Sequence, residues 1–207
     1  MESKTQFRKT KTPKVSLSVK LIHHLLFLSL LLSGCYSTKK TVERSRPNSE
    51  KIDWPSEYNP EEAGFFVHNE IDIKADPQIV WDLLIDAESW PNWYEGMTDV
   101  SVKTNPNGKL DSSTVLSFKT MGQFFETVTV KEFEPPYRLS WEATRKDIRG
   151  YHAWLIIPTK EGCKVITSET QHGLKAFMQK AFLPNKLRKL HDVWLTEFKN
   201  KAEKMAS

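Results

Sequence analysis

The stretch Asp76-Pro77-Gln78-Ile79-Val80-Trp81-Asp82-Leu83-Leu84 decides the fold of this 207-residue chain. Asp76 is a residue type that caps helix N-termini, and Pro77 suits the first helical position, where a missing N–H leaves no bond unmade. Apolar residues then recur at helical spacing and predict one buried face: Ile79, Val80, Leu83 and Leu84. The stretch therefore predicts a short helix, and the alternating residues Phe65–Ile73 before it predict a strand.

Downstream of this helix the chain changes to strand periodicity. The cluster Trp90-Pro91-Asn92-Trp93-Tyr94 predicts a second short helix or turn, and after Met97 short apolar runs alternate with turn signals such as Asn105-Pro106-Asn107-Gly108. Such spacing is typical of an antiparallel meander. The predicted strands are Thr98–Lys103, Thr114–Thr120, Phe124–Phe133, Arg138–Thr144, Tyr151–Ile157 and Lys164–Gln171.

The chain closes with helical periodicity. Pro184 separates a short predicted helix, Leu174–Phe182, from a longer one, because proline interrupts helical hydrogen bonding. The longer helix has about five turns and one apolar face. That face consists of Leu187, Leu190, Trp194, Leu195, Phe198, Ala202 and Met205.

Four stretches resemble the START-like superfamily, which includes the polyketide cyclase/dehydrase and lipid-transport proteins often labelled SRPBCC. They are Asp76–Leu84, Trp90–Trp93, Phe133-Glu134-Pro135-Pro136-Tyr137-Arg138-Leu139-Ser140-Trp141 and Glu169-Thr170-Gln171-His172-Gly173, and the resemblance covers about Phe65–Ala206. It implies an α+β helix-grip fold, with a curved antiparallel sheet of about seven strands around a long C-terminal helix and two short helices after the first strand. It also implies an apolar cavity between sheet and helix. Because the superfamily contains carriers, sensors and enzymes, no reaction is implied.

Upstream of the domain, Leu21–Cys35 reads LIHHLLFLSLLLSGC and follows a basic segment. This order of charged, apolar and small residues is typical of a secretory signal peptide. Leu32-Ser33-Gly34-Cys35 resembles the lipobox of bacterial lipoproteins, in which the cysteine is lipidated and begins the mature chain. The alternative of an uncleaved anchor is disfavoured, because Leu21–Leu32 spans only about 18 Å as a helix and the hydrocarbon layer is about 30 Å thick.

These features divide the chain into three predicted parts. Residues 1–34 form the signal peptide, residues 35–62 a lipidated N-terminus with a flexible polar tether, and residues 63–207 the START-like domain. Within the tether, Trp54 and Tyr58 are exceptions that dock either on the domain or at the membrane interface. The expected location is the bacterial cell envelope, with Cys35 as the membrane anchor. Tyr36 after it resembles lipoproteins of the outer membrane that face the periplasm, if the chain is Gram-negative.

Removal of the leader changes the charge and the cysteine count. Residues 1–34 hold six of the 30 Lys and Arg but one of the 26 Asp and Glu, so the formal charge of +4 falls to about −1. A nucleic-acid partner is therefore not expected. With Cys35 acylated, Cys163 is the only remaining thiol, and we interpret it as a small buried hydrophobic residue.

Strand alternation and aromatic character select the candidate ligand-binding residues. They are Tyr94, Phe118, Glu126, Val128, Trp141, His152, Trp154 and Trp194. Glu126 shares the parity of apolar Val128, so it is either a polar anchor or general acid in the cavity, or a residue at a bulge or strand end that reaches water. His152 either orients a ligand or exchanges a proton, or is simply hydrogen-bonded in place. Tyr94 and Trp194 belong either to the cavity wall or to the core.

Motifs for metals, cofactors and catalysis are not found. The histidines after Cys35 lack metal-ligand spacing, and no GxSxG, P-loop or dinucleotide fingerprint occurs. The sequence therefore predicts no catalytic residue, no metal and no cofactor. It does not predict an oligomeric state.

The leading functional prediction is the binding of a hydrophobic small molecule or lipid, as a carrier, scavenger or sensor. One alternative is a cyclase- or dehydrase-like enzyme that transfers protons through Glu126, His152 or a pocket tyrosine. Another is an interaction module with a filled core. In that module Trp141, Trp154 and Trp194 would pack together without a void.

Overall fold

The computed structural model describes residues 50–207. The predicted signal peptide, the lipidation of Cys35 and the tether up to residue 49 lie outside the described residues. None of the helices within residues 50–207 combines the length and apolar character needed to cross a membrane.

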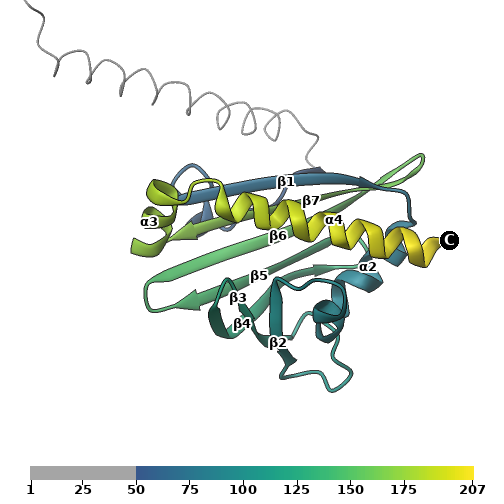
Figure 1. Ribbon diagram of the computed structural model, residues 1–207, viewed down its shortest axis with the longest axis horizontal. Helices are drawn as coiled ribbons and strands as arrows, with labels where there is room; N and C mark the ends of the chain where they lie inside the picture. The colour runs from purple at the N-terminus through teal and green to yellow at the C-terminus, as the bar shows by residue number, and fades with distance from the viewer. Residues whose placement is uncertain (1–49) are drawn as a thin grey trace, which may run out of the picture. The chain divides into compact units, whose positions relative to one another are not determined.

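The domain is built on one seven-stranded antiparallel sheet with the spatial order β1-β7-β6-β5-β4-β3-β2 (Figure 1). Strands β2 to β7 follow one another as a meander, and β1 joins the sheet by pairing with β7. This arrangement confirms the predicted α+β fold with an antiparallel meander. The strands are β1 Phe65–Ile73, β2 Met97–Val102, β3 Val115–Thr120, β4 Gln123–Glu134, β5 Arg138–Arg145, β6 Ile148–Thr159 and β7 Gly162–His172.

A 3-10 helix that the sequence did not predict, η2 Ser56–Tyr58, precedes β1. The other helices follow the predicted order, with two short ones after β1 and two at the C-terminal end. They are α2 Pro77–Ile85, the 3-10 helix η3 Ala87–Asn92, α3 Leu174–Phe182 and α4 Lys186–Ala206. The Asp76 side chain accepts a hydrogen bond of 2.8 Å from the Gln78 amide, which confirms the predicted cap. Helix α4 packs across one face of the sheet, and its buried side chains include Trp194 and Phe198 (Figure 1). This is the helix-grip arrangement.

The opposite face of the central strands is covered by the segment that precedes β1. Ile52 and Tyr58 are buried there against a cluster of Tyr151, Ala153, Leu155 and Ile166. The Tyr58 hydroxyl also donates a 2.8 Å hydrogen bond to Glu142. The prediction of a solvated tether is therefore wrong for Ile52. Of the two docking sites predicted for Trp54 and Tyr58, the structure shows the domain, where both rings contact Tyr151. The same packing explains why β6 is apolar on both faces.

Cys163 is fully buried in the core between the sheet and α4. Burial raises the pKa of its thiol to about 11, so the thiolate is scarce at neutral pH. Both observations agree with the predicted structural role of this residue.

Candidate ligand cavity

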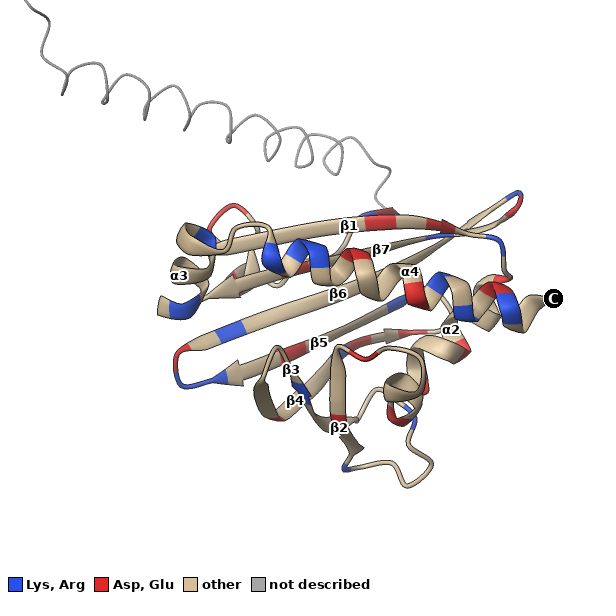
Figure 2. Cartoon of the chain, in the orientation of Figure 1, with Lys and Arg blue, Asp and Glu red and all other residues tan. Residues whose placement is uncertain are grey.

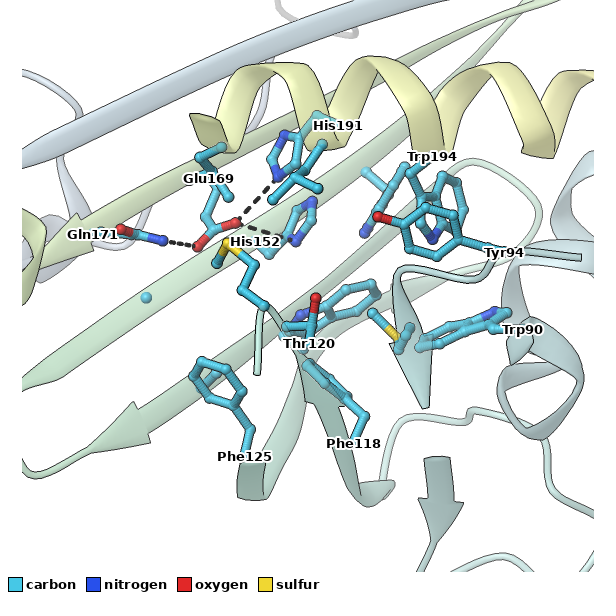
Figure 3. A pocket seen from close by; sticks show the side chains of 18 of the residues that line it. Trp90, Tyr94, Phe118, Thr120, Phe125, His152, Glu169, Gln171, His191 and Trp194 are labelled. Carbon is cyan, nitrogen blue, oxygen red and sulfur yellow. Dashed lines mark hydrogen bonds and ion pairs between the residues drawn. The ribbon is translucent and has the colours of Figure 1, made fainter. Parts of the chain in front are cut away.

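A cavity of about 100 Å³ lies between the sheet and α4 (Figure 3). Most of its wall is apolar or aromatic, and only one end is rich in polar groups. The wall is drawn from β2 to β7, from the residues after α2, and from one side of α4. Its apolar lining includes Trp90, Tyr94, Met97, Phe118, Met121, Phe125, Trp141, Ala143, Trp154, Leu187, Leu190 and Trp194.

Six of the eight predicted ligand-binding residues line this cavity: Tyr94, Phe118, Trp141, His152, Trp154 and Trp194. Val128 is fully buried in the core but is not part of the lining. Glu126 is exposed and is not part of the lining either. Their selection as cavity-lining residues is therefore wrong. For Glu126 the structure agrees with the other predicted alternative, a residue at a bulge that reaches water.

A β-bulge accounts for the position of Glu126. Leu116 of β3 pairs with Val128, whereas Phe118 pairs with Phe125, so β4 holds one more residue than β3 between these two pairs. The extra residue reverses the alternation of side chains along β4. As a result Phe125 lines the cavity and Glu126 reaches water.

Three tryptophans form the aromatic side of the cavity. The ring centroids of Trp154 and Trp194 are 4.5 Å apart, and those of Trp141 and Trp154 are 5.8 Å apart. The three rings pack together, as the interaction-module alternative predicts. They also border the cavity, whereas that alternative requires packing without a void. The buried Nε1–H of Trp154 has no hydrogen-bond partner among the described residues. An unmade bond of this kind is costly, so the indole offers a donor to a bound molecule.

The polar end of the cavity is organised around the Glu169 carboxylate (Figure 3). Its Oε1 accepts a 2.6 Å hydrogen bond from the Gln171 side-chain amide. Its Oε2 lies 3.3 Å from Nε2 of His191 and 3.6 Å from Nδ1 of His152. On the other side of the His152 ring, Nε2 is 2.6 Å from the Thr167 hydroxyl. Residues from β6, β7 and α4 thus form one connected group.

Burial determines the ionisation of this group. It lowers the pKa of His152 from 6.5 to about 3, against the attraction of Glu169. Burial alone would raise the pKa of Glu169, but the hydrogen bond from His191, the neighbouring His152 and the Gln171 amide together lower it. At pH 7 the site therefore holds a neutral His152 imidazole beside a carboxylate. We assign the Thr167 hydroxyl as donor to Nε2 of His152, which leaves the ring proton on Nδ1 toward Glu169.

The side chains of His152, Glu169 and His191 offer ligand atoms that lie within 4.8 Å of one another. A metal ion must lie close to the plane of each imidazole that binds it, because the lone pair is in that plane. The two rings are instead stacked, with centroids 4.8 Å apart and an angle of 11° between their planes. Their lone pairs therefore do not converge, and the arrangement favours hydrogen bonding and proton exchange over metal binding.

Sequence reasoning identified His152 but missed Glu169, Gln171 and His191. The turn at Lys160-Glu161-Gly162 pairs β6 with β7 so that His152 lies directly opposite Glu169. That register was available from the turn and would have placed the carboxylate beside the imidazole. His191 was not accessible in this way, since its position depends on how α4 packs on the sheet.

The fold and the cavity define a helix-grip domain with an internal, largely apolar binding site. The chain belongs to the family described as polyketide cyclase / dehydrase and lipid transport, whose model matches residues 65–203. Members of this family bind hydrophobic small molecules or lipids, which agrees with the predicted class of partner.

Solved structures support the same fold. The hypothetical protein jhp0584 from Helicobacter pylori is 27% identical over 76% of this chain and 99% of its own, with a TM-score of 0.70. TTHA0849 from Thermus thermophilus is 17% identical over 69% of this chain and 99% of its own, with a TM-score of 0.57. The di-domain ARO/CYC StfQ from the steffimycin biosynthetic pathway is 14% identical, covering 69% of this chain and 53% of StfQ, with a TM-score of 0.57. No curated protein matches the chain.

Proposed function

We propose that this protein binds a small amphiphile or a lipid in the cavity between its sheet and α4, and acts as a carrier, scavenger or sensor. The observation that carries the proposal is a set of buried polar atoms without partners among the described residues, on the wall of an apolar cavity. They are Nε1 of Trp154, Nδ1 of His191 and Oε1 of Gln171. Each leaves a hydrogen bond for a ligand to make.

The chemistry of the wall indicates the chemistry of the ligand. The ionised Glu169 favours a hydroxyl, amide or amino group at the polar end, because a carboxylate only accepts hydrogen bonds. The tryptophan rings favour a flat or aliphatic body. The ligand that fits best is therefore an amphiphile with one polar group that can donate a hydrogen bond.

The size of the cavity bears on how such a molecule would enter. A closed apolar cavity of about 150 Å³ accepts benzene, and this cavity holds about 100 Å³. A larger ligand must therefore displace part of the wall. Met121 and Leu190 line both the cavity and a surface depression beside it, which also includes Lys186. Because methionine is flexible, Met121 and Leu190 form the part of the wall that can yield most easily.

Native mass spectrometry of the full chain with an envelope lipid extract tests the proposal. The wild type is expected to retain a bound molecule, and Ala143→Phe to reduce its occupancy about tenfold, because the added ring fills the cavity that Ala143 lines. Thr144→Phe is the matched control, since the neighbouring Thr144 is exposed and outside the lining.

A wild type without any bound molecule, or equal occupancy in both variants, would rule out the proposed site. Thermal unfolding of both variants shows whether lost occupancy reflects a filled cavity or a lost fold. Recovery of the added molecule in a chemically altered form would assign a reaction to the cavity instead of carriage.

We also propose that Cys35 anchors the protein to a bacterial membrane. The support is the basic segment followed by an apolar run that ends in Leu32-Ser33-Gly34-Cys35. Cys35→Ala is expected to move the mature protein from the membrane fraction to the soluble fraction. Mature protein that stays in the membrane fraction after this substitution would contradict lipid anchoring.

A further inference from the structure

We propose that α3 and the loop after it dock on the surface of an anionic lipid bilayer. The docking is argued independently of the proposed function. Only its role in the passage of a ligand between membrane and cavity rests on that function. The central observation is that α3 carries its apolar face toward solvent. A helix normally buries such a face, so this one lacks a partner within residues 50–207.

The exposed apolar side chains of the described domain are concentrated on this one element. Five of its nine exposed large hydrophobic residues lie between positions 174 and 183. Leu174 is 71% exposed, Phe177 61% and Phe182 70%. Scattered exposed hydrophobic residues are ordinary, whereas a contiguous patch marks a contact surface.

Helical spacing places most of these residues on a single stripe. Leu174, Phe177 and Phe182, with Met178 and Ala181, recur at steps of three and four residues along α3. Ala176 is the only buried residue of α3, where it packs with Phe65, Val67 and Leu187. The helix is thus attached to the domain through one small side chain and turns its large ones outward.

The charge around this stripe is strongly positive. Residues 174–190 contain five basic side chains and no acidic one: Lys175, Lys180, Lys186, Arg188 and Lys189. The Lys175 amide donates a 3.3 Å hydrogen bond to the Asp147 carbonyl in the turn between β5 and β6, and Arg145 and Lys146 come directly before Asp147. Figure 2 shows basic segments in α3, at the start of α4 and at the end of the β5–β6 hairpin. Asp147 is the one acidic residue of this turn, and it is paired with Lys175 at 2.8 Å.

This combination of apolar and basic groups decides between the possible occupants. An apolar stripe flanked by Lys and Arg is typical of helices that lie in the interface of an anionic membrane. A second copy of this chain would bring the same excess of positive charge to the contact, and the two copies would repel each other. The bilayer is therefore the occupant that satisfies both features.

The docking face adjoins the part of the cavity wall that can yield. Met121 packs against the cluster of Ala176 and Leu187 that holds α3, and it also lines the cavity. Lys175 lies 3.5 Å from the Gln123 side chain in the same turn region. A bilayer on α3 would thus lie beside Met121 and Leu190. An amphiphile could then pass between membrane and cavity with little exposure to water.

Hydrogen–deuterium exchange of the full chain, mixed with vesicles, tests the docking. The probes are vesicles of phosphatidylcholine alone and vesicles that also contain phosphatidylglycerol. Amides of residues 174–183 are expected to exchange about tenfold more slowly with the anionic vesicles than without vesicles. The measurement reports on α3 alone. A lipid anchor near the N-terminus would bring the protein to the vesicle but would not by itself slow the exchange of these amides.

Two pairs of variants separate the charged and apolar contributions. Lys180→Glu with Lys189→Glu is expected to abolish the protection, whereas Lys201→Glu with Lys204→Glu, on exposed residues at the far end of α4, is expected to retain it. Phe182→Ser is expected to weaken the protection, and Val193→Ser, which also changes an exposed apolar residue, is not.

Three results would overturn the docking proposal. Exchange in α3 that is unchanged by anionic vesicles would exclude the bilayer. Protection without vesicles that rises with protein concentration would identify a second copy as the occupant. Protection without vesicles at every concentration would identify a segment of residues 1–49. Ala143→Phe separates this proposal from the ligand site, because it is expected to lose the bound molecule and to retain protection of α3.

Discussion

Phe198→Ala is expected to lower the free energy of unfolding by about 4 kcal/mol. Phe198 is fully buried on α4, and its ring centroid lies 4.6 Å from that of Trp194 and 5.7 Å from that of Trp93. Truncation removes the apolar contacts of the ring and leaves a void that rigid tryptophan neighbours cannot close. Domains of this size have a total stability of about 5–15 kcal/mol, so the loss is a large part of it.

Urea unfolding followed by tryptophan fluorescence measures this effect. Val193→Ala is the matched control, because Val193 lies on the same helix and is 51% exposed. Its expected cost is about 0.5 kcal/mol. A loss of less than about 1 kcal/mol for Phe198→Ala would mean that α4 does not close the core of the sheet.

The elements of this fold could be predicted because their signals are local. The cap at Asp76 and the strand Phe65–Ile73 appear in the structure where the sequence places them. The same holds for α3, whose bounds Leu174–Phe182 were predicted from spacing and from Pro184. Spacing does not reveal what a face packs against, so the outward direction of the apolar stripe on α3 could not be predicted.

The predictions that were wrong or left open concern residues whose environment depends on contacts with other segments. Strand parity could not decide whether Glu126 faces the cavity or water, because the bulge in β4 depends on the pairing with β3. Ile52 was assigned to a solvated tether, and the docking site of Tyr58 was left open, because their partners lie on distant strands, such as Tyr151 of β6. Glu169 is a different case, because the hairpin turn between β6 and β7 gives the register that places it opposite His152, and this register was not used.

Acid is expected to destabilise the protein through His152. Burial depresses its pKa to about 3 in the folded state, from 6.5 in the unfolded chain. Between these two values the unfolded chain binds a proton that the folded protein does not, so stability rises with pH. The expected slope approaches about 1.4 kcal/mol per pH unit from about pH 6 down to about pH 4. The stability that depends on a neutral His152 is fully present above pH 6.5 and is lost as the pH falls toward 3.

His152→Gln is expected to flatten this slope, which urea unfolding at a series of pH values measures. Other groups with a lowered pKa act in the same direction. The carboxyl groups among them act mainly below about pH 4.5, whereas His172 acts in the same pH range as His152. Burial and Arg149 lower the pKa of His172, so His172→Gln is the matched control and is expected to retain most of the slope. Glu169 contributes only below the ordinary pKa of a glutamate, 4.5, because its own pKa is lowered in the fold. If the free energy of unfolding of His152→Gln still rises between pH 5 and 6.5 as it does in the wild type, another residue is the buried, neutral imidazole. Glu169 would then face a charged His152 at the polar end of the cavity.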